Sequence, residues 1–331
     1  MKKINLLLVI LFTGLLFSAC ETDIDIIADY EDITVVYGLL NQDSITYLKI
    51  NKAFLGEGNA LIMAKVEDSS NYTGMLDVKI EEWASGNLLN TFQLDTVTID
   101  NKEPGLFYNP YQILYKTEEP LNEDFKYKLK IQVGEKQVTS ETELVHDFSI
   151  TKPSAGSAFI KFTYSHNPSK VEWLSAVNGK RYEVIIRFNF IEKSVNNPDT
   201  TYRYVDWILG TRKSQSLQGG ESMEIAYLGE TFFSICENSI PYEDPAKEAD
   251  VIFRYPGNID FIFSVAGEDL NTYIEVNEPS NSIVQVKPEY SNIVNGIGVF
   301  SARYKKIRSK LLHAESFALL EDLNIKFYHL K

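Results

Sequence analysis

The sequence predicts a mainly β protein, with an N-terminal immunoglobulin-like β-sandwich and a C-terminal β-rich domain carrying a few short helices. Two observations predict this fold class. Apolar and polar residues alternate in many short runs, which are separated by Gly, Asn, Asp and Ser turns. Tyr and Phe, which favour strands, occur 19 times each. The hydrophobic content of 44% is too high for a disordered chain.

Two pairs of runs near the N-terminus predict β-hairpins. Residues 33–40 and 45–50 flank a polar turn, and residues 78–83 and 88–94 flank a Ser-Gly-Asn turn. Residues 125–133 alternate most regularly and are followed by a Gly-Glu-Lys turn and another run. This alternation predicts a half-buried antiparallel strand. About seven such strands within residues 32–148 are typical of a sandwich, although the Cys and Trp signature of true immunoglobulin domains is absent.

A Pro-, Ser- and Gly-containing stretch at 151–156 predicts a domain boundary, so the C-terminal domain is expected to span 152–331. Within it, periodicity predicts strands at 181–190, 201–209, 259–266, 299–304 and 325–328, and helices at 230–237, 268–274 and 316–322.

The first 19 residues have the pattern of a secretion signal. Lys2 and Lys3 precede an apolar run at 4–17, which is shorter than the roughly 20 residues that span a bilayer. The run ends in Leu-Phe-Ser-Ala before Cys20, which resembles the lipobox of bacterial lipoproteins. That resemblance implies cleavage before Cys20 and attachment of acyl chains such as palmitate to it. The protein would then be held at a membrane by lipid, through an acidic tether at 20–31.

The only other cysteine, Cys236, has no partner for a disulfide once Cys20 carries lipid. Its neighbours are apolar, which predicts a buried side chain rather than a nucleophile.

The charge of the chain excludes one class of partner. Removal of residues 1–19 takes two of the 32 basic residues and none of the 46 acidic ones, so the net charge falls from −14 to −16. Such a chain is a poor partner for nucleic acid.

A distinctive motif lies at 290–300, Tyr-Ser-Asn-Ile-Val-Asn-Gly-Ile-Gly-Val-Phe, after Glu-Asp-Leu-Asn-Thr-Tyr at 268–273. In this order, the two segments resemble a Bacteroidota family of outer-membrane lipoproteins of unknown function (domain of unknown function four-two-four-nine). The resemblance implies an N-terminal sandwich, a C-terminal β-rich domain and a gene near a TonB-dependent outer-membrane receptor. It implies an outer-membrane location, on the periplasmic or the cell-surface face, and it carries over no catalytic residue.

The same motif has a physical interpretation. Asn295-Gly296 favours a turn with positive φ, and Gly298 permits close backbone approach. A hairpin that closes the domain is favoured over a ligand-binding loop.

Catalytic and metal-binding patterns are missing from the sequence. The four histidines have no metal-ligand spacing, and neither a Gly-x-Ser-x-Gly elbow nor a phosphate-binding glycine loop occurs. We therefore expect no cofactor and no enzymatic activity, although sequence spacing does not exclude paired glycosidase carboxylates.

Two aromatic clusters are candidates for binding. Phe107, Tyr108, Tyr111 and Tyr115 surround an Asn-Pro pair that predicts a loop, where packing explains aromatic residues less easily. In the second cluster, at 202–207, Tyr202 and Tyr204 share a strand face and Trp207 lies on the other, which is typical of ordinary sheet packing.

Three functions remain open. The favoured one is a non-enzymatic envelope lipoprotein that binds a ligand, such as a glycan or peptide, or a partner protein for a TonB-dependent system. The others are a structural or adhesive surface protein of the pilus-associated kind and, less favoured, a carbohydrate-active enzyme.

Overall fold

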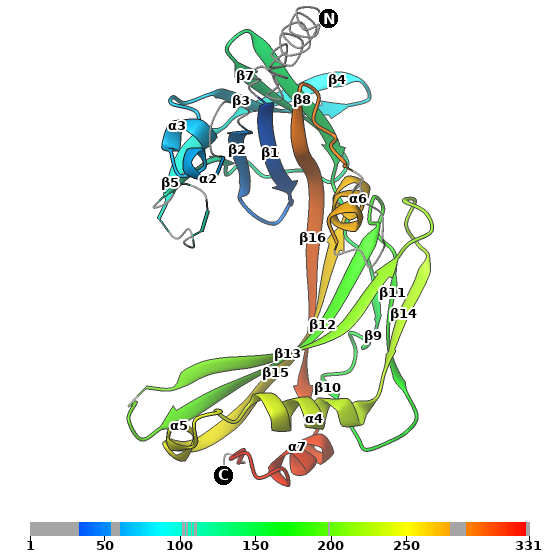
Figure 1. Cartoon of the computed structure of the whole chain (residues 1–331). Helices are drawn as coiled ribbons and strands as arrows, with labels where there is room; N and C mark the ends of the chain where they lie inside the picture. The colour runs from blue at the N-terminus through cyan, green and yellow to red at the C-terminus, as the bar shows by residue number, and fades with distance from the viewer. Residues whose placement is uncertain are drawn as a thin grey trace, which may run out of the picture.

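The computed structural model has two lobes joined by one long strand, β16 (Gly296–Leu312) (Figure 1). The upper lobe contains β1 to β8 and the first half of β16, and the lower lobe contains β9 to β15 and its second half. Strands dominate both lobes, so the mainly β fold class is confirmed. The structure describes residues 33–53, 60–100, 103, 105–106, 108, 111–197, 199–278 and 289–328.

The upper lobe is a sandwich of two sheets. One sheet has the order β16-β1-β2-β6-β5, and the other has the order β4-β3-β7-β8. The strands are β1 (Ile33–Leu40), β2 (Thr46–Ala53), β3 (Asp77–Ala84), β4 (Asn87–Gln93), β5 (Asp95–Ile99), β6 (Gln112–Thr117), β7 (Lys126–Val133) and β8 (Lys136–Glu143).

Alternation places one face of each main strand in the core. On β7, Tyr127, Leu129 and Ile131 are fully buried, whereas Phe125 and Val133 at its ends are half-buried. The β1–β2, β3–β4 and β7–β8 hairpins all form at the predicted turns. The immunoglobulin-like topology in particular stays a prediction.

The strand β16 belongs to both lobes. Its first seven residues pair in parallel with β1, from Thr34 opposite Gly296 to Leu40 opposite Ala302. Its next nine pair antiparallel with β15 (Val251–Ala266), from Ala266 opposite Arg303 to Asn258 opposite Leu311. A segment from the C-terminal part of the chain therefore completes the N-terminal sandwich, while the division at 148 and 152 stays a prediction.

Backbone contact explains the glycines in the 290–300 motif. Gly298 has φ +118°, and a Cβ placed there would lie 2.0 Å from the carbonyl oxygen of Val36 on β1. Asn295 has the positive φ expected of the turn, at 59°. The hairpin interpretation is corrected, because Val294 makes only an isolated bridge to Thr139 of β8 and β16 then pairs with β1.

The lower lobe packs a long twisted sheet against a smaller one. The long sheet has the order β13-β12-β15-β16, and the smaller has the order β14-β11-β9. Its remaining strands are β9 (Ile150–Lys152), β10 (Phe159–Ile160), β11 (Ser169–Leu174), β12 (Arg181–Ser194), β13 (Thr201–Lys213) and β14 (Ser222–Tyr227).

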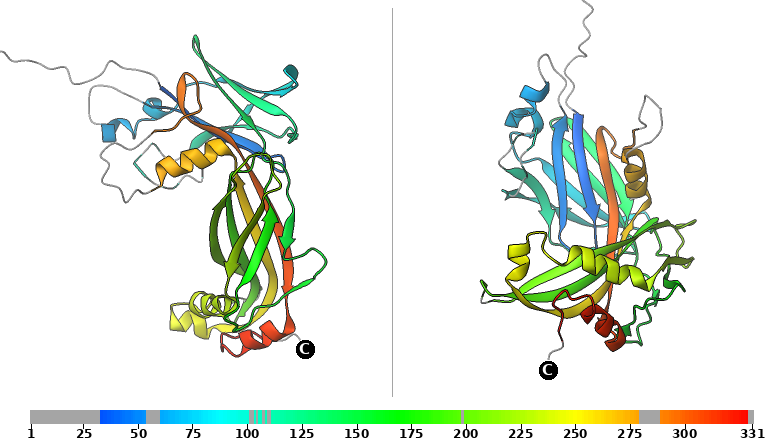
Figure 2. Two further views of the ribbon diagram at one scale, coloured as in Figure 1. Left: turned by 90° about the vertical axis from the view of Figure 1, so that its right-hand side faces the viewer. Right: turned by 60° about the horizontal axis from the view of Figure 1, so that its bottom comes forward.

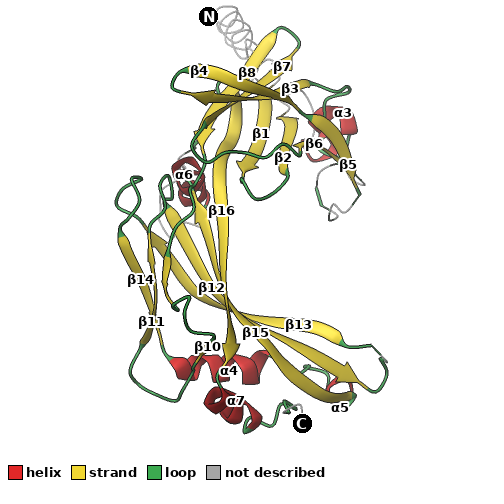
Figure 3. Ribbon diagram, turned by 180° about the vertical axis from the view of Figure 1, so that it is seen from behind, coloured by secondary structure: helices red, strands yellow, loops and turns green. Residues whose placement is uncertain are grey.

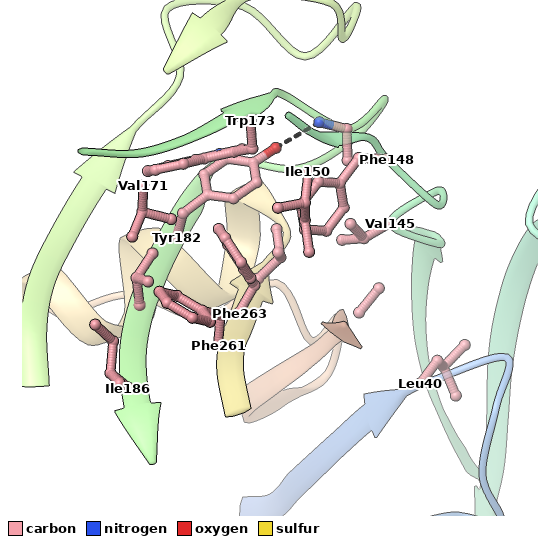
Figure 4. Close-up of a cluster of buried hydrophobic side chains, with 14 of the residues drawn as sticks. Leu40, Val145, Phe148, Ile150, Val171, Trp173, Tyr182, Ile186, Phe261 and Phe263 are labelled. Atoms are coloured by element: carbon pink, nitrogen blue, oxygen red, sulfur yellow. Dashed lines mark hydrogen bonds between the residues drawn. The ribbon is translucent and has the colours of Figure 1, made fainter. Parts of the chain in front are cut away.

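Large aromatic side chains fill the space between these sheets. Trp173 of β11 lies 5.7 Å from Tyr182 of β12 and 5.4 Å from Phe263 of β15, measured between ring centroids (Figure 4). The hydroxyl of Tyr182 accepts a hydrogen bond from the backbone N–H of Ala176 at 2.7 Å, which satisfies its polar end in the core. The buried cluster continues through Leu40 and Val145 into the upper lobe.

Short helices cover the ends of the sheets. Those of the lower lobe, α4, α5 and α7, gather at the end far from the upper lobe (Figure 3), and α6 lies beside the upper part of β16 (Figure 2). The helices are α2 (Ala60–Met63), α3 (Glu67–Ser70), α4 (Gly229–Ser239), α5 (Pro245–Ala249), α6 (Glu268–Asn277) and α7 (Ala314–Glu321).

The three predicted helices are α4, α6 and α7, and the predicted strands at 181–190, 201–209, 259–266 and 299–304 also form. The last predicted strand, at 325–328, is wrong, because only Phe327 makes an isolated bridge to Arg254. Among the described residues, the helices are all too short or too polar to cross a bilayer.

Candidate functional site

The predicted aromatic loop divides into a core residue and a surface pair. Tyr115, on β6, is 3% exposed, and its hydroxyl accepts a hydrogen bond from the backbone N–H of Leu76 at 2.9 Å. Its ring belongs to the sandwich core, which removes it from the candidate binding residues. The continuous apolar run at 113–115 is the sequence signal that this segment is a strand rather than a loop.

Tyr108 and Tyr111 remain at the surface, each half-buried. Their ring centroids lie 5.7 Å apart in an edge-to-face contact. The Tyr111 hydroxyl donates to the carboxylate of Glu67 on α3, and this bond raises the pKa of Tyr111. Part of the surface of these two tyrosines is therefore already in contact with the other ring and with α3. Phe107 lies outside the described residues, as does Cys20.

The second aromatic cluster has the predicted faces. Tyr202 and Tyr204 project to solvent from the edge strand β13, and Tyr202 is 85% exposed. Trp207 is half-buried on the other face and packs against Phe162 and Tyr227. Its packing agrees with an ordinary structural role.

A cleft lies where β16 passes from one lobe to the other. Its cavity volume is about 690 Å³, and residues of both lobes line it. Leu39 and Ser44 come from the β1–β2 hairpin, and Leu270 and Ile274 come from α6. Clefts between lobes are common ligand sites because two rigid units contribute to one concave surface.

The floor of the cleft is the outer face of the long lower sheet, which points away from the aromatic core. Arg303 and Lys305 are exposed and two residues apart on β16, so both lie on this face. Arg181 of β12 lies on it two strands away, because both Arg181 and Arg303 pair with Ala266 of β15. The floor thus carries three cations, together with the carboxylate of Glu183, which lies across Ser264 from Lys305.

Helix α6 neutralises part of this charge. Glu278, just after the helix, contacts Arg181 at 2.6 Å, and Glu275 contacts Lys213 of β13 at the same distance. Among the described residues, Arg303 and Lys305 have no carboxylate within 4.0 Å. Two positive side chains therefore face the cleft without an ion-pair partner among the described residues, and Glu183 lies on the same floor two strands from Lys305.

A second charged cluster lies at the far end of the lower lobe and is closed. Arg254, fully buried on β15, donates through Nε to Glu192 at 2.8 Å. Its two terminal nitrogens donate to the two carboxylate oxygens of Glu248 at 2.9 and 2.7 Å. Arg203 and Tyr242 also donate to Glu192, at 2.6 and 2.8 Å. This network joins β12, β13, β15 and α5, so we assign it a structural role.

The two carboxylates of this network stay ionised, although Glu192 is buried and Glu248 is half-buried. Burial raises the pKa of Glu192, but hydrogen bonds from Tyr242, Arg203 and Arg254 outweigh it and lower the pKa. Burial also raises the pKa of Glu248, but the hydrogen bonds from Arg254 and from the backbone N–H of Tyr242, together with the charges of Arg254 and Lys326, outweigh it and lower the pKa.

The free cysteine has the environment predicted for it. Cys236 is fully buried on α4, and burial raises the pKa of its thiol. A protonated thiol in the core is a poor nucleophile. In the described part of the chain, His, Cys, Asp and Glu form no group of three able to hold a metal ion.

Comparison with known proteins adds no assignment to this geometry. The chain matches no protein-family model, and a search of curated proteins finds no match. The resemblance to the Bacteroidota lipoproteins stays a prediction.

Proposed function

We propose that this protein is a non-enzymatic, lipid-anchored envelope protein that binds a ligand or partner in the cleft between its lobes. The observation that carries the proposal is the cleft of about 690 Å³, which is lined from both lobes and has Arg181, Arg303 and Lys305 as well as Glu183 on its floor. A rigid strand common to both lobes holds its walls in register, and preorganised walls reduce the entropy lost on binding.

The lipid anchor and the partner system are further parts of the proposal. The Leu-Phe-Ser-Ala-Cys sequence supports lipid attachment at Cys20, and the motif at 290–300 supports membership of the Bacteroidota outer-membrane family. A TonB-dependent receptor would then be the partner in transport. The immunoglobulin-like classification of the upper lobe belongs here too, supported by its two packed sheets.

Filling the cleft tests the binding role. Ser264 lies on the floor, between Glu183 and Lys305 in the sheet, so Ser264→Trp places a large ring where a ligand would lie. We expect tagged wild-type protein from native membranes to carry a bound molecule in native mass spectrometry, and S264W to lack it. Thr98→Trp, on the exposed face of β5, is the matched control. The same bound species in S264W and wild type would contradict the proposal.

Replacement of Cys20 tests the anchor. Cys20→Ala should abolish incorporation of labelled palmitate and release the protein from the membrane. Continued labelling of C20A would refute lipidation at this residue.

A further inference from the structure

The arrangement of side chains in the cleft indicates the chemistry of its ligand. Neighbouring strands of a sheet lie about 4.8 Å apart, so Arg181 and Arg303 stand about 9.6 Å apart with one strand between them. The residue between them is Ala266, a small side chain that lines the same cavity and is 8% exposed. Lys305 lies two residues beyond Arg303 on the same face of β16.

Cations without an ion-pair partner favour an anionic ligand. Arg181 is held by Glu278, whereas Arg303 and Lys305 have no described carboxylate within ion-pair distance. Arg303 and Lys305 lie about 7 Å apart along one strand and repel each other, while Glu183, the carboxylate on the same floor, lies two strands from Lys305. An anionic group entering the cleft would relieve this repulsion, and Arg and Lys are the usual donors to carboxylate, sulfate and phosphate.

Apolar side chains stand beside the cations. Leu270 and Ile274 lie one turn apart on α6, and Leu39 approaches from β1. These three side chains are half-buried and line the same cavity. A small inorganic anion would leave them uncovered, whereas an organic anion would contact both parts of the wall.

We propose that the cleft binds an organic anion, whose charged group is held by Arg303 and Lys305 while its apolar part packs against Leu270 and Ile274. This inference rests on the proposed function, because it names the class of ligand for the same cleft. Carboxylate, sulfate and phosphate share the required chemistry.

Two matched dyes test the ligand class. The probes are 8-anilinonaphthalene-1-sulfonate, an anionic amphiphile, and N-phenyl-1-naphthylamine, which has the same rings without the sulfonate. We expect the wild type, residues 21–331, to bind the sulfonate more tightly. R303A/K305A should weaken sulfonate binding about tenfold or more and leave the neutral dye unchanged, since each 1.4 kcal/mol changes affinity tenfold.

Control variants separate charge from general surface effects. R303K/K305R keeps both charges and should retain sulfonate binding. K79A/K170A removes two exposed strand lysines far from the cleft and should change neither dye. Near-ultraviolet circular dichroism checks that each variant keeps native packing, because loosened cores also bind the sulfonate.

The filled cleft separates the two hypotheses. If S264W abolishes binding of both dyes but R303A/K305A changes neither, the anion inference is overturned while the binding role stands. If S264W affects neither dye, both dyes bind elsewhere and the cleft loses its proposed role. Selective loss of the sulfonate in R303A/K305A, with S264W blocking both dyes, supports the inference.

Discussion

The two clusters of basic side chains in the lower lobe differ in whether carboxylates pair with them. Arg254 is fully buried, and Glu192, Glu248 and a backbone carbonyl take up its donors. Arg303 and Lys305 are exposed at the other end of the same sheet and have no described carboxylate partner. Buried charges persist in folded proteins when partners satisfy them, so the first cluster is structural. The second is left open toward a cleft, which favours binding.

Breaking the closed cluster should have the largest effect. Arg254→Met removes a cation from the buried carboxylate of Glu192 and from the half-buried carboxylate of Glu248, and removal of one partner from a buried pair costs about 3–5 kcal/mol. Urea unfolding of the variant and the wild type measures this loss. Lys170→Met, which breaks the exposed pair with Glu224, is the control and should change stability little. Equal stability of R254M and wild type would remove the structural role.

A milder change in the same cluster should have an intermediate effect. Arg203 donates to Glu192 at 2.6 Å, but Arg254 still neutralises that carboxylate when Arg203 is replaced. Arg203→Ala should therefore cost about 1.5–3 kcal/mol, the value of one hydrogen bond to a charged group. The measurement is again urea unfolding. A loss as large as that of R254M would contradict this ranking and mean that Arg203 stabilises the cluster as much as Arg254 does.

Acid should weaken the closed cluster in a defined direction. The pKa values of Glu192 and Glu248 are lowered in the folded protein from the ordinary value of 4.5. Groups with a lowered pKa contribute stability that is full above 4.5 and is lost as the pH falls through the folded value. The free energy of unfolding should thus decline below pH 4.5. Glu192→Gln should flatten this decline, and an unchanged slope would show that other carboxylates cause it.

The open cluster should show the smallest effect on stability. R303A/K305A removes two exposed cations that repel each other, so the free energy of unfolding should stay the same or rise slightly. Thermal and urea unfolding measure it. A clear loss of stability would show that both side chains support the fold, and the contrast between the two clusters would fail.

Local sequence patterns predict most of the strands and helices, but they do not predict which distant strands pair. Alternation located the strand at 125–133 and the buried face of Tyr127, because strand period is a local property. The parallel pairing of β16 with β1 joins residues near opposite ends of the chain, and no local pattern encodes it. Gly298 held a signal for close backbone approach, but its partner, Val36, was not identifiable.

The candidate site was predicted less well than the fold. The sequence predicts a strand that ends at residue 304 and therefore does not assign Lys305 to either face of the sheet. In the structure, β16 continues to Leu312. The aromatic signal around 107–115 favoured a loop, and Tyr115 instead fills the core. The sequence does not predict that Arg254 is buried and paired, because its partners come from β12 and α5 and meet only in the folded lobe.

A crystal structure of the mature protein with bound 8-anilinonaphthalene-1-sulfonate tests the central claim most directly. We predict density in the cleft, with the sulfonate within ion-pair distance of Arg303 or Lys305 and the rings against Leu270 and Ile274. Density only at another surface, or an empty cleft at a saturating dye concentration, would contradict the claim that the open basic cluster is a ligand site.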